Sequence, residues 1–191
     1  MTWEKDASTT SQDLRIGAPC LWAREHGHLI QPGARVLDLA AGSGRHALWA
    51  AELGAAVTAV ERDPARMDQG RRAAEFLDLK GIEWVAADLT SYVISPRSFD
   101  VVLMFSYLDR SRLPHFLDAV KPGGYFIAET FLIWQRELGW GPTREDFLLQ
   151  PGELWRLVRS FELVIGREAL EPSEHGIRAV ASVVALRAHD S

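Results

Sequence analysis

Cysteine is nearly absent from this chain, and long apolar runs are absent altogether. Cys20 is the single cysteine among 191 residues, so an internal disulfide framework is excluded and a reducing compartment is expected. The start, Met1–Ser11, is polar and lacks the apolar stretch of a signal peptide, and no run of about 20 apolar residues occurs. We therefore expect a cytoplasmic protein without a membrane partner.

Basic residues are also scarce. Lys and Arg number 21 against 26 Asp and Glu, which gives a formal net charge of −5, and no basic run exceeds Arg71-Arg72. Proteins that bind nucleic acid usually present a basic face. No His/Cys cluster has the spacing of metal ligands. The scarcity of basic residues favours a small-molecule substrate over nucleic acid, and the lack of a ligand cluster predicts no metal site. Monomer and homodimer both stay open.

What the chain does contain is the composition of an ordinary globular domain. Hydrophobic residues make up 47% and charged residues 25% of the sequence, which is enough for one core, so we expect a single domain over 1–191. Short apolar runs alternate with longer segments of helical period. This alternation predicts an α/β fold, Rossmann-like and doubly wound, with a mostly parallel sheet and helices on both faces.

The expected elements follow from these runs and from the residues that interrupt them. The predicted strands are Ala34–Leu39, Ala55–Val60, Ile82–Ala86, Phe99–Phe105 and Tyr125–Glu129, followed by an antiparallel edge hairpin of Phe161–Ala169 and Ile177–Leu186. The predicted helices are Arg45–Leu53, one opened by the Asp63 cap and Pro64 and ending near Leu79, Leu113–Val120 and Pro151–Arg159. Lys121–Gly124 is a predicted turn.

Two further segments are expected to close over a site. The N-terminal segment Ala18–Ile30 has helical character and is predicted to lie across the site's opening. The segment 134–148 contains Gly139, Gly141 and Pro142, and these residues favour a loop or lid.

A glycine-containing turn after the first predicted strand is the most informative stretch. It runs Asp38-Leu39-Ala40-Ala41-Gly42-Ser43-Gly44. A strand that ends in Gly-x-Gly brings bare backbone against a ligand, because side chains there would block the approach. Alone, the two glycines also fit an ordinary turn.

Acidic residues follow the next two predicted strands. Glu61 lies about twenty residues past the glycine turn, where a carboxylate can accept hydrogen bonds from ribose hydroxyls; it also fits an exposed strand end. Asp88, in Ala86-Ala87-Asp88-Leu89, can receive an adenine amine or cap a short helix. Three acidic residues at three successive strand ends are more specific than any one of them.

From Ala34 to Glu129 the chain resembles the class I S-adenosyl-L-methionine (SAM)-dependent methyltransferases. The resemblance rests on the Val36–Gly44 stretch, on Glu61 and Asp88, and on Lys121–Gly124. It implies a seven-stranded sheet with a reversed C-terminal strand, and SAM as cofactor. The residues it implies for cofactor binding are Asp38, Ala40, Gly42, Gly44, Arg45, Glu61, Arg62, Asp88, Leu89 and Phe105. Ala40 stands where many members have glycine, and we expect slightly tighter packing there.

A Rossmann dehydrogenase is the competing interpretation of the same turn. Gly42-x-Gly44-x-x-Ala47 satisfies the dinucleotide pattern, and Glu61 would serve a ribose there too. Asp38, however, would face a pyrophosphate of like charge. Asp88 and Lys121–Gly124 would have no role in such an enzyme, so methyl transfer is favoured.

The C-terminal third carries a narrower resemblance, to bacterial methyltransferases of the tellurite-resistance type. It rests on Glu129-Thr130-Phe131, Asp146–Leu149 and Pro151–Leu154, and it implies a small acceptor such as a soft chalcogen, a thiol or an oxyanion. The fourth strand continues into Phe105-Ser106-Tyr107-Leu108, which is not the Asn/Asp-Pro-Pro-aromatic sequence of many nucleic-acid N-methyltransferases. Oxygen and nitrogen acceptors usually require a base, whereas soft sulfur, selenium or tellurium acceptors can react without one.

Candidate catalytic residues are those expected near the methyl group. Tyr107 follows the fourth strand, and Glu129 ends the fifth, where it acts as a base or pairs with an arginine. His175 and Arg178 lie in the final hairpin, where they bind an anion or face solvent. A SAM-dependent methyltransferase acting on a small molecule is the predicted function. The alternatives are a catalytically silent SAM-binding module and a protein or RNA methyltransferase.

Overall fold

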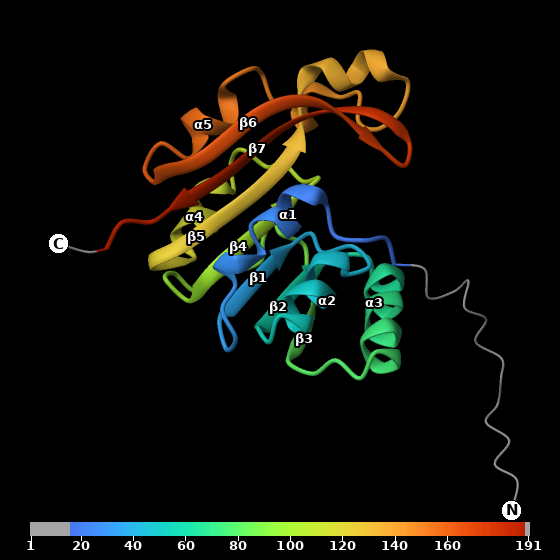
Figure 1. The fold of residues 1–191 in the computed structure, drawn as a ribbon, viewed down its shortest axis with the longest axis vertical. Helices are drawn as coiled ribbons and strands as arrows, with labels where there is room; N and C mark the ends of the chain where they lie inside the picture. The colour runs from blue at the N-terminus through green and yellow to red at the C-terminus, as the bar shows by residue number, and fades with distance from the viewer. Residues whose placement is uncertain (1–15, 190–191) are drawn as a thin grey trace, which may run out of the picture.

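A computed structural model describes residues 16–189 of the chain. These residues form a seven-stranded sheet flanked by helices on both faces (Figure 1). The strands are β1 (Arg35–Leu39), β2 (Ala56–Glu61), β3 (Ile82–Ala86), β4 (Phe99–Phe105), β5 (Val120–Phe131), β6 (Glu162–Ser173) and β7 (Gly176–Leu186). The α-helices are α1 (Leu21–Glu25), α2 (Arg45–Glu52), α3 (Pro64–Phe76), α4 (Leu113–Asp118) and α5 (Glu153–Leu157). Short 3-10 helices cover Gly27–Leu29, Ile133–Leu138 and Glu145–Phe147.

The strand order is β3-β2-β1-β4-β5-β7-β6. Strands β1 to β5 pair in parallel, whereas β7 runs antiparallel to both β5 and β6. The mostly parallel Rossmann-like sheet, its reversed C-terminal strand and the edge hairpin predicted from the sequence are therefore confirmed. Because the parallel strands end at one edge, that edge collects the loops that follow β1, β2, β3 and β4.

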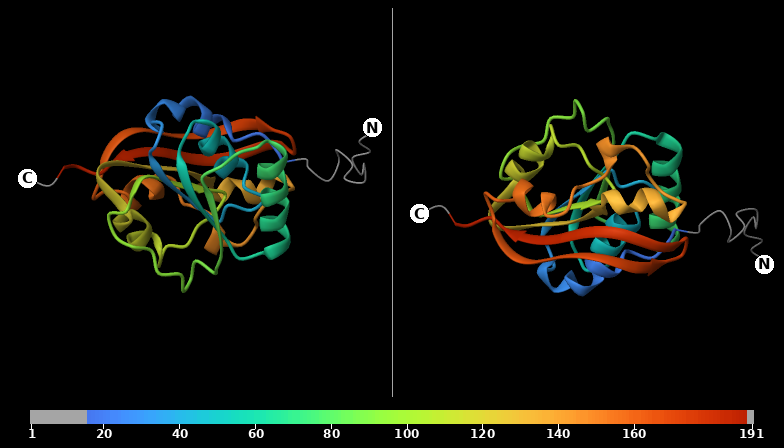
Figure 2. Two further views of the ribbon diagram at one scale, coloured as in Figure 1. Left: turned by 90° about the horizontal axis from the view of Figure 1, so that it is seen from below. Right: turned by 90° about the horizontal axis from the view of Figure 1, so that it is seen from above.

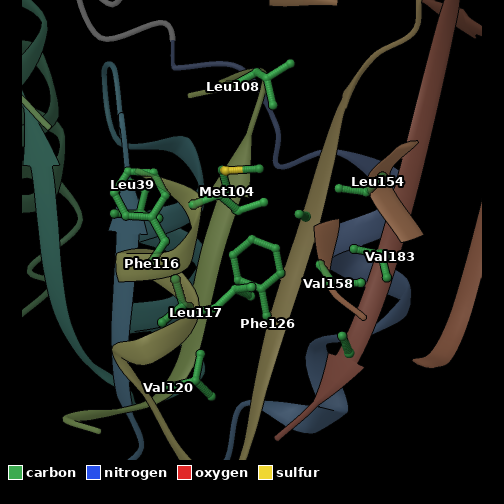
Figure 3. Packing of buried hydrophobic residues seen from close by; sticks show 14 of the residues in the cluster. Leu39, Met104, Leu108, Phe116, Leu117, Val120, Phe126, Leu154, Val158 and Val183 are labelled. Carbon is green, nitrogen blue, oxygen red and sulfur yellow. The ribbon is translucent and has the colours of Figure 1, made fainter. Parts of the chain in front are cut away.

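Side-chain alternation along the strands builds a core on each face of the sheet. In β4, Val102 and Met104 join the cluster under α4 and α5, together with Phe116 and Phe126 (Figure 3). Val101, Leu103 and Phe105 face the other way and pack with residues of α1 and α2. Figure 2 shows the sheet between these two layers of helices. A central strand that buries both faces has a continuous apolar sequence, which is why the predicted and observed bounds of β4 coincide.

The ends of several elements differ from the sequence-based expectations. Asp63 caps α3 by accepting a hydrogen bond from the Ala65 amide, and Pro64 follows in the first turn, as predicted. The helix stops at Phe76 rather than near Leu79, and Asp78 adopts the left-handed φ of 52°. Strand β5 begins at Val120 rather than Tyr125, since the expected turn at 121–124 is a kink within the strand. Similar small shifts affect β2, α4, α5 and β6.

The expected helix over Ala18–Ile30 is broken in two. It consists of α1 and a separate 3-10 turn at Gly27–Leu29. A Cβ on Gly27 would stand 2.9 Å from the Trp49 ring, so the chain passes close to α2 at the break. No helix among residues 16–189 is both long and apolar enough to cross a bilayer. The polar start Met1–Ser11 lies outside the described residues.

Candidate cofactor and acceptor site

A cavity of about 710 Å³ opens at the edge of the sheet where the parallel strands end. Its walls come from the ends of β1, β2 and β3, from the loop after β4, and from the segment around 131–147. The lining residues are Ala40, Val60, Glu61, Arg62, Arg66, Ala87, Asp88, Leu89, Thr90, Ser106, Tyr107, Leu108, Asp109, Arg110, Ser111, Phe131, Pro142, Asp146 and Phe147. A cavity of this size is typical of sites for small ligands and cofactors.

The turn after β1 uses left-handed backbone at three alternate residues. The φ angles are 54° at Ala40, 60° at Gly42 and 80° at Gly44. Two glycines adopt this conformation without cost, whereas Ala40 holds its Cβ there against a steric penalty. A Cβ on Gly44 would also collide with the Trp84 ring from β3. The turn therefore needs glycine at 44 for two independent reasons.

Glu61, at the end of β2, holds this turn in place. Its Oε2 accepts a hydrogen bond from the Gly42 amide at 2.8 Å, and its Oε1 accepts one from the Asp63 amide at 2.8 Å. The residue is only 8% exposed and lines the cavity. Glu61 thus presents a fixed carboxylate at the cavity wall rather than a solvated strand end.

Asp38 lies at the same edge and is buried. It is 1% exposed, and its Oδ2 has no hydrogen-bond partner among the described residues. Burial raises the pKa of Asp38 from 3.8 to about 7, although the Ala47 amide and Arg45 act in the opposite direction. A buried carboxylate without a partner is costly unless a donor or a cation meets it.

Asp88, after β3, is a more exposed wall residue. Its Oδ1 accepts a hydrogen bond from the Thr90 amide at 2.9 Å, and its Oδ2 lies 3.9 Å from the Arg62 guanidinium. The hydrogen bonds from Thr90 lower the pKa of Asp88, so the side chain is an anion at neutral pH. Leu89 beside it is buried. The short helix that Asp88 was expected to cap does not form; its carboxylate caps a turn at residues 88–91 instead, and it also lines the cavity.

Two aromatic residues, Phe105 at the end of β4 and Tyr107 just after it, lie near the cavity, and Tyr107 lines it. Phe105 stacks on His46 with a centroid distance of 4.1 Å, and His46 Nε2 accepts a hydrogen bond from the Cys20 amide. Burial lowers the pKa of His46 to about 3, so this imidazole stays neutral. Ser106 has a left-handed φ of 55° and, with Tyr107, lines the cavity. Burial raises the pKa of the Tyr107 hydroxyl.

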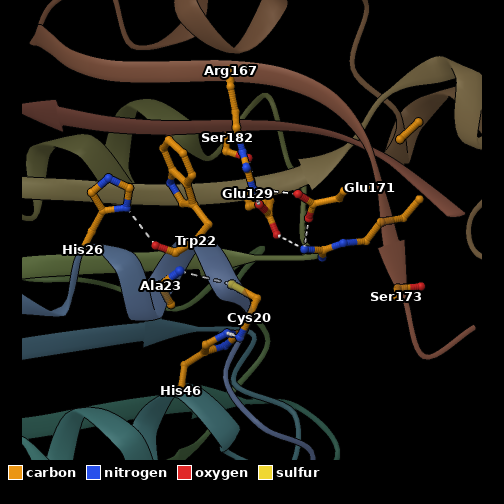
Figure 4. A network of polar contacts seen from close by, with 12 residues as sticks. Cys20, Trp22, Ala23, His26, His46, Glu129, Arg167, Glu171, Ser173 and Ser182 are labelled. Atoms are coloured by element: carbon orange, nitrogen blue, oxygen red, sulfur yellow. Dashed lines mark hydrogen bonds and ion pairs between the residues drawn. The ribbon is translucent and has the colours of Figure 1, made fainter.

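Glu129, at the end of β5, lies in a charged network on the α1 face of the sheet (Figure 4). Its Oε1 is 2.8 Å from the Arg178 guanidinium, and its Oε2 accepts a hydrogen bond from the Ser182 hydroxyl at 2.8 Å. Glu171 pairs with both Arg178 and Arg167. Glu129 was expected either to act as a base or to pair with an arginine. The structure shows the pairing, with Arg178.

The remaining predicted site residues lie outside the described lining of the cavity. His175 is 64% exposed at the β6–β7 turn, with its ring 5.2 Å from that of Trp140. Arg45 lines a separate apolar hollow of about 440 Å³ beside α2 and α3. Six of the predicted site residues line the cavity: Ala40, Glu61, Arg62, Asp88, Leu89 and Tyr107. Four more lie at the same edge of the sheet without lining it: Asp38, Gly42, Gly44 and Phe105. The lining does not include Glu129, His175 or Arg178.

The N-terminal segment does not cover the cavity as expected. No residue of 18–30 is among the described lining residues. Trp22 is buried on the sheet face, where its Nε1 donates a hydrogen bond to the Val183 carbonyl and its ring lies 4.9 Å from the Arg167 guanidinium carbon. The buried apolar residues of α1 lie in the same cluster as Val184 of β7. The helix therefore packs on the sheet and does not close the cavity.

Sequence reasoning missed several lining residues. Arg110, Ser111 and Asp109 come from the loop after β4, and Arg66 comes from the first turn of α3. Phe131, the last residue of β5, was also missed. Pro142, Asp146 and Phe147, in contrast, belong to the predicted lid segment 134–148. The polar sequence Asp109-Arg110-Ser111, four to six residues after the end of a mostly buried strand, is the pattern that would have indicated the wall that follows β4.

Known proteins resemble the chain in sequence. A family model described as a methyltransferase domain matches residues 36–124. A demethylmenaquinone methyltransferase of Renibacterium salmoninarum is 30% identical over 173 residues, which cover 87% of this chain and 67% of that protein. Another of that name, from Clavibacter sepedonicus, is 33% identical over 125 residues, which cover 62% of this chain and 50% of that protein. The chain spans 50%, 42% and 45% of the first three curated relatives it matches, about half their length.

Solved structures resemble it in fold. A SAM-dependent methyltransferase from Methanosarcina mazei has a TM-score of 0.70 at 19% identity, covering 85% of this chain and 96% of that one. TehB from Haemophilus influenzae has a TM-score of 0.71 at 19% identity, covering 86% of this chain and 61% of that one. Together with the sheet topology, these likenesses define a Rossmann-like methyltransferase fold. The chain belongs to the class I SAM-dependent methyltransferases, and SAM is its cofactor.

Proposed function

We propose that this protein transfers a methyl group from SAM to a small-molecule acceptor, with the cofactor held at the carboxyl ends of β1 to β4. The observation that carries the proposal is the Asp38 carboxylate, which is buried beside the left-handed turn and leaves Oδ2 without a described partner. A cationic ammonium group suits that oxygen in hydrogen bonding and in charge. The residues present therefore suit the amino-acid half of SAM.

The other cofactor contacts follow from the same edge of the sheet. We assign the backbone of Ala40–Gly44 and Asp38 to the amino-acid half, and the Glu61 carboxylate, already fixed by two amides, to the ribose hydroxyls. Asp88 is assigned to the adenine amine, with Leu89 flanking the ring. We also assign Arg45 at the start of α2, Arg62 directly after β2 and Phe105 at the end of β4 to the cofactor site. The cofactor supplies an electrophilic methyl on a sulfonium, so the protein's task is to position a nucleophile.

A soft acceptor such as a thiol or a chalcogen species is the first candidate. A thiolate or a chalcogen anion attacks without a general base, because it already lacks the proton. No histidine or lysine is among the described lining residues, although carboxylates are. Tyr107 is the one predicted catalytic residue in that lining, and we assign it to contact the acceptor. Glu129 is engaged by Arg178 and Ser182, so we assign it a supporting role.

An aromatic hydroxyl acceptor is the second candidate. Tyr107, Phe131 and Phe147 all line the cavity, and planar rings pack well against such walls. Two relatives are named demethylmenaquinone methyltransferases and another a ubiquinone biosynthesis O-methyltransferase. We also propose a cytoplasmic location, where such metabolites and SAM are both present.

Calorimetry with SAM and with its demethylated product is the direct test of the cofactor assignment. Glu61→Gln is the site variant, and Glu83→Gln, an exposed glutamate on the neighbouring strand, is its matched control. We expect the Glu61 variant to bind both ligands more weakly and the Glu83 variant to match the wild type. Equal binding by all three proteins contradicts the placement of the ribose.

Methyl transfer from labelled SAM to a panel of acceptors tests the reaction. The panel contains thiols, selenite, tellurite and small phenols, with a bulk RNA and a protein extract as macromolecular arms. Label on a small acceptor supports the proposal. Label confined to RNA or protein overturns the small-molecule assignment, and tight SAM binding without any transfer indicates a silent binding module.

A further inference from the structure

Arg110 joins two segments that both line the cavity, the loop after β4 and the lid segment. Its Nε and Nη2 donate to the two carboxylate oxygens of Glu153, at 2.6 Å and 3.0 Å. Its Nη1 donates to the Asp146 carbonyl at 2.9 Å, and its Nη2 also donates to the Leu148 carbonyl at 2.7 Å. One guanidinium therefore binds a carboxylate in bidentate fashion and also binds two backbone carbonyls.

Both segments contribute residues to the lining of the cavity. Ser106–Ser111, which contains Arg110, is the wall that follows β4, and Pro142, Asp146 and Phe147 belong to the lid segment. Among the described lining residues, Arg110 is the one whose side chain donates hydrogen bonds from the first wall to the second. This side chain therefore ties the lid segment to the loop after β4.

The lid segment is fixed at its base but exposed along its span. Leu148 and Leu149 are buried, and the Leu149 amide donates to the Phe131 carbonyl at 2.9 Å. Residues 143–147 are exposed. Arg110 acts at the junction between these two parts, because it binds the carbonyls of both Asp146 and Leu148.

The Arg110–Glu153 pair has the features of a persistent contact. Its side chains are 36% and 16% exposed, and Glu153 Oε2 also accepts a hydrogen bond from the Gln150 amide at 2.7 Å. The Arg110 hydrogen bond lowers the pKa of Glu153, so the carboxylate stays charged at neutral pH. Bidentate pairs of this kind are stronger and more directional than single ion pairs.

We propose that Arg110 is a positioning residue that sets the width of the SAM and acceptor cavity by holding the lid segment at a fixed distance from the loop after β4. The expected effect on binding and catalysis rests on the proposed function, because cavity width affects them only if the cofactor and acceptor bind there. The holding of the lid itself is a property of the ligand-free protein. The two parts can therefore be tested separately.

Hydrogen exchange on the ligand-free protein tests the structural part. The variants are Arg110→Lys, Arg110→Ala and Glu153→Gln. Lysine keeps the positive charge but cannot donate two parallel hydrogen bonds to the Glu153 carboxylate as the guanidinium does. Arg159→Ala removes an exposed arginine from the same surface and is the matched control. We expect faster exchange of the Phe147, Leu148 and Leu149 amides in the first three proteins, with the core amides of β4 unchanged and the control like the wild type.

Binding and kinetics test the functional part on the same proteins. We expect SAM to bind roughly tenfold more weakly to Arg110→Lys and Arg110→Ala, and kcat to fall further than acceptor KM rises, because misplacement affects the reacting geometry most. A variant that only lowers overall stability would lose binding in proportion to the fraction unfolded, and thermal melts measure that fraction.

The outcomes separate the two claims. Unchanged exchange of the lid amides in Arg110→Lys and Glu153→Gln overturns the positioning role, whatever the ligand results are. Faster exchange with SAM affinity kept within twofold overturns the link to cavity width. Absence of SAM binding by the wild type contradicts the proposed function, and the exchange rates of the lid amides then still decide whether Arg110 holds the lid.

Discussion

The carboxylate of Glu61 holds the glycine turn by accepting a hydrogen bond from the Gly42 amide, with 2.8 Å between Oε2 and the nitrogen. The contact joins the end of β2 to the loop after β1, so the two strand ends are fixed relative to each other without any ligand. A charged acceptor on a backbone donor in a nearly buried site is a strong hydrogen bond. This pairing underlies the first prediction.

Replacing Glu61 with Ala should weaken SAM binding more than replacing it with Gln. Alanine removes the acceptors for both the Gly42 and the Asp63 amides, whereas glutamine keeps one neutral acceptor. We expect a loss of roughly tenfold for Gln and more for Ala. Calorimetry measures it, and equal affinity of the two variants would show that the amide contacts do not matter.

Asp38 should make stability depend on pH between about 4 and 7. Burial raises its pKa in the folded protein from 3.8 to about 7, so the folded state holds the proton more tightly than the unfolded chain. Its contribution to the free energy of unfolding is fully present below pH 3.8 and is lost as the pH rises through about 7. Asp38→Asn should remove this loss, and thermal melts across the range measure it.

The same titration should appear in SAM binding. A bound ammonium group favours the Asp38 carboxylate, so binding near pH 6 should release a proton, and the binding enthalpy should vary with the ionisation enthalpy of the buffer. Asp68→Asn, an exposed aspartate on α3, is the control and should behave like the wild type. A wild-type enthalpy that is the same in every buffer would argue against ammonium binding at Asp38.

Ala40→Gly should leave the protein as stable as the wild type or more so. Ala40 has a φ of 54°, and a left-handed alanine costs about 1–2 kcal/mol, somewhat more than the about 0.5–1 kcal/mol that glycine adds in unfolded-state entropy. Ala51→Gly, in the last turn of α2, is the control and should lose stability, because glycine costs up to about 1 kcal/mol relative to alanine in a helix. Chemical denaturation compares the two, and equal losses would contradict the strain assigned to Ala40.

Glu129→Gln should destabilise the protein strongly, because it leaves the buried Arg178 guanidinium without part of its counter-charge. Glu129 and the Arg178 side chain are 2% and 13% exposed, and breaking a buried pair by neutralising one partner costs about 3–5 kcal/mol. Glu145→Gln, in an exposed pair with Arg136, is the control and should have little effect. Unchanged denaturation of the Glu129 variant with an abolished rate would instead indicate a base.

The sequence alone determined the sheet and the cofactor edge, because both depend on local pattern. The apolar run of β4, the Asp63-Pro64 start of α3 and the acidic residues at or just after the ends of β1, β2 and β3 are each visible within a few residues. Parallel strands must also end at one edge. That is why the sequence predicts Glu61 and Asp88 in one site, and both line a single cavity.

Only the tertiary structure decided which distant side chains meet. Whether Glu129 faces an acceptor or Arg178 depends on β7 lying next to β5, a pairing of residues some fifty positions apart in the chain. The position of α1 depends on the contact between Trp22 and β7. Arg110 and Glu153, which form an ion pair, are 43 residues apart in the chain. Such contacts are set by packing over long sequence separations, which local periodicity does not encode.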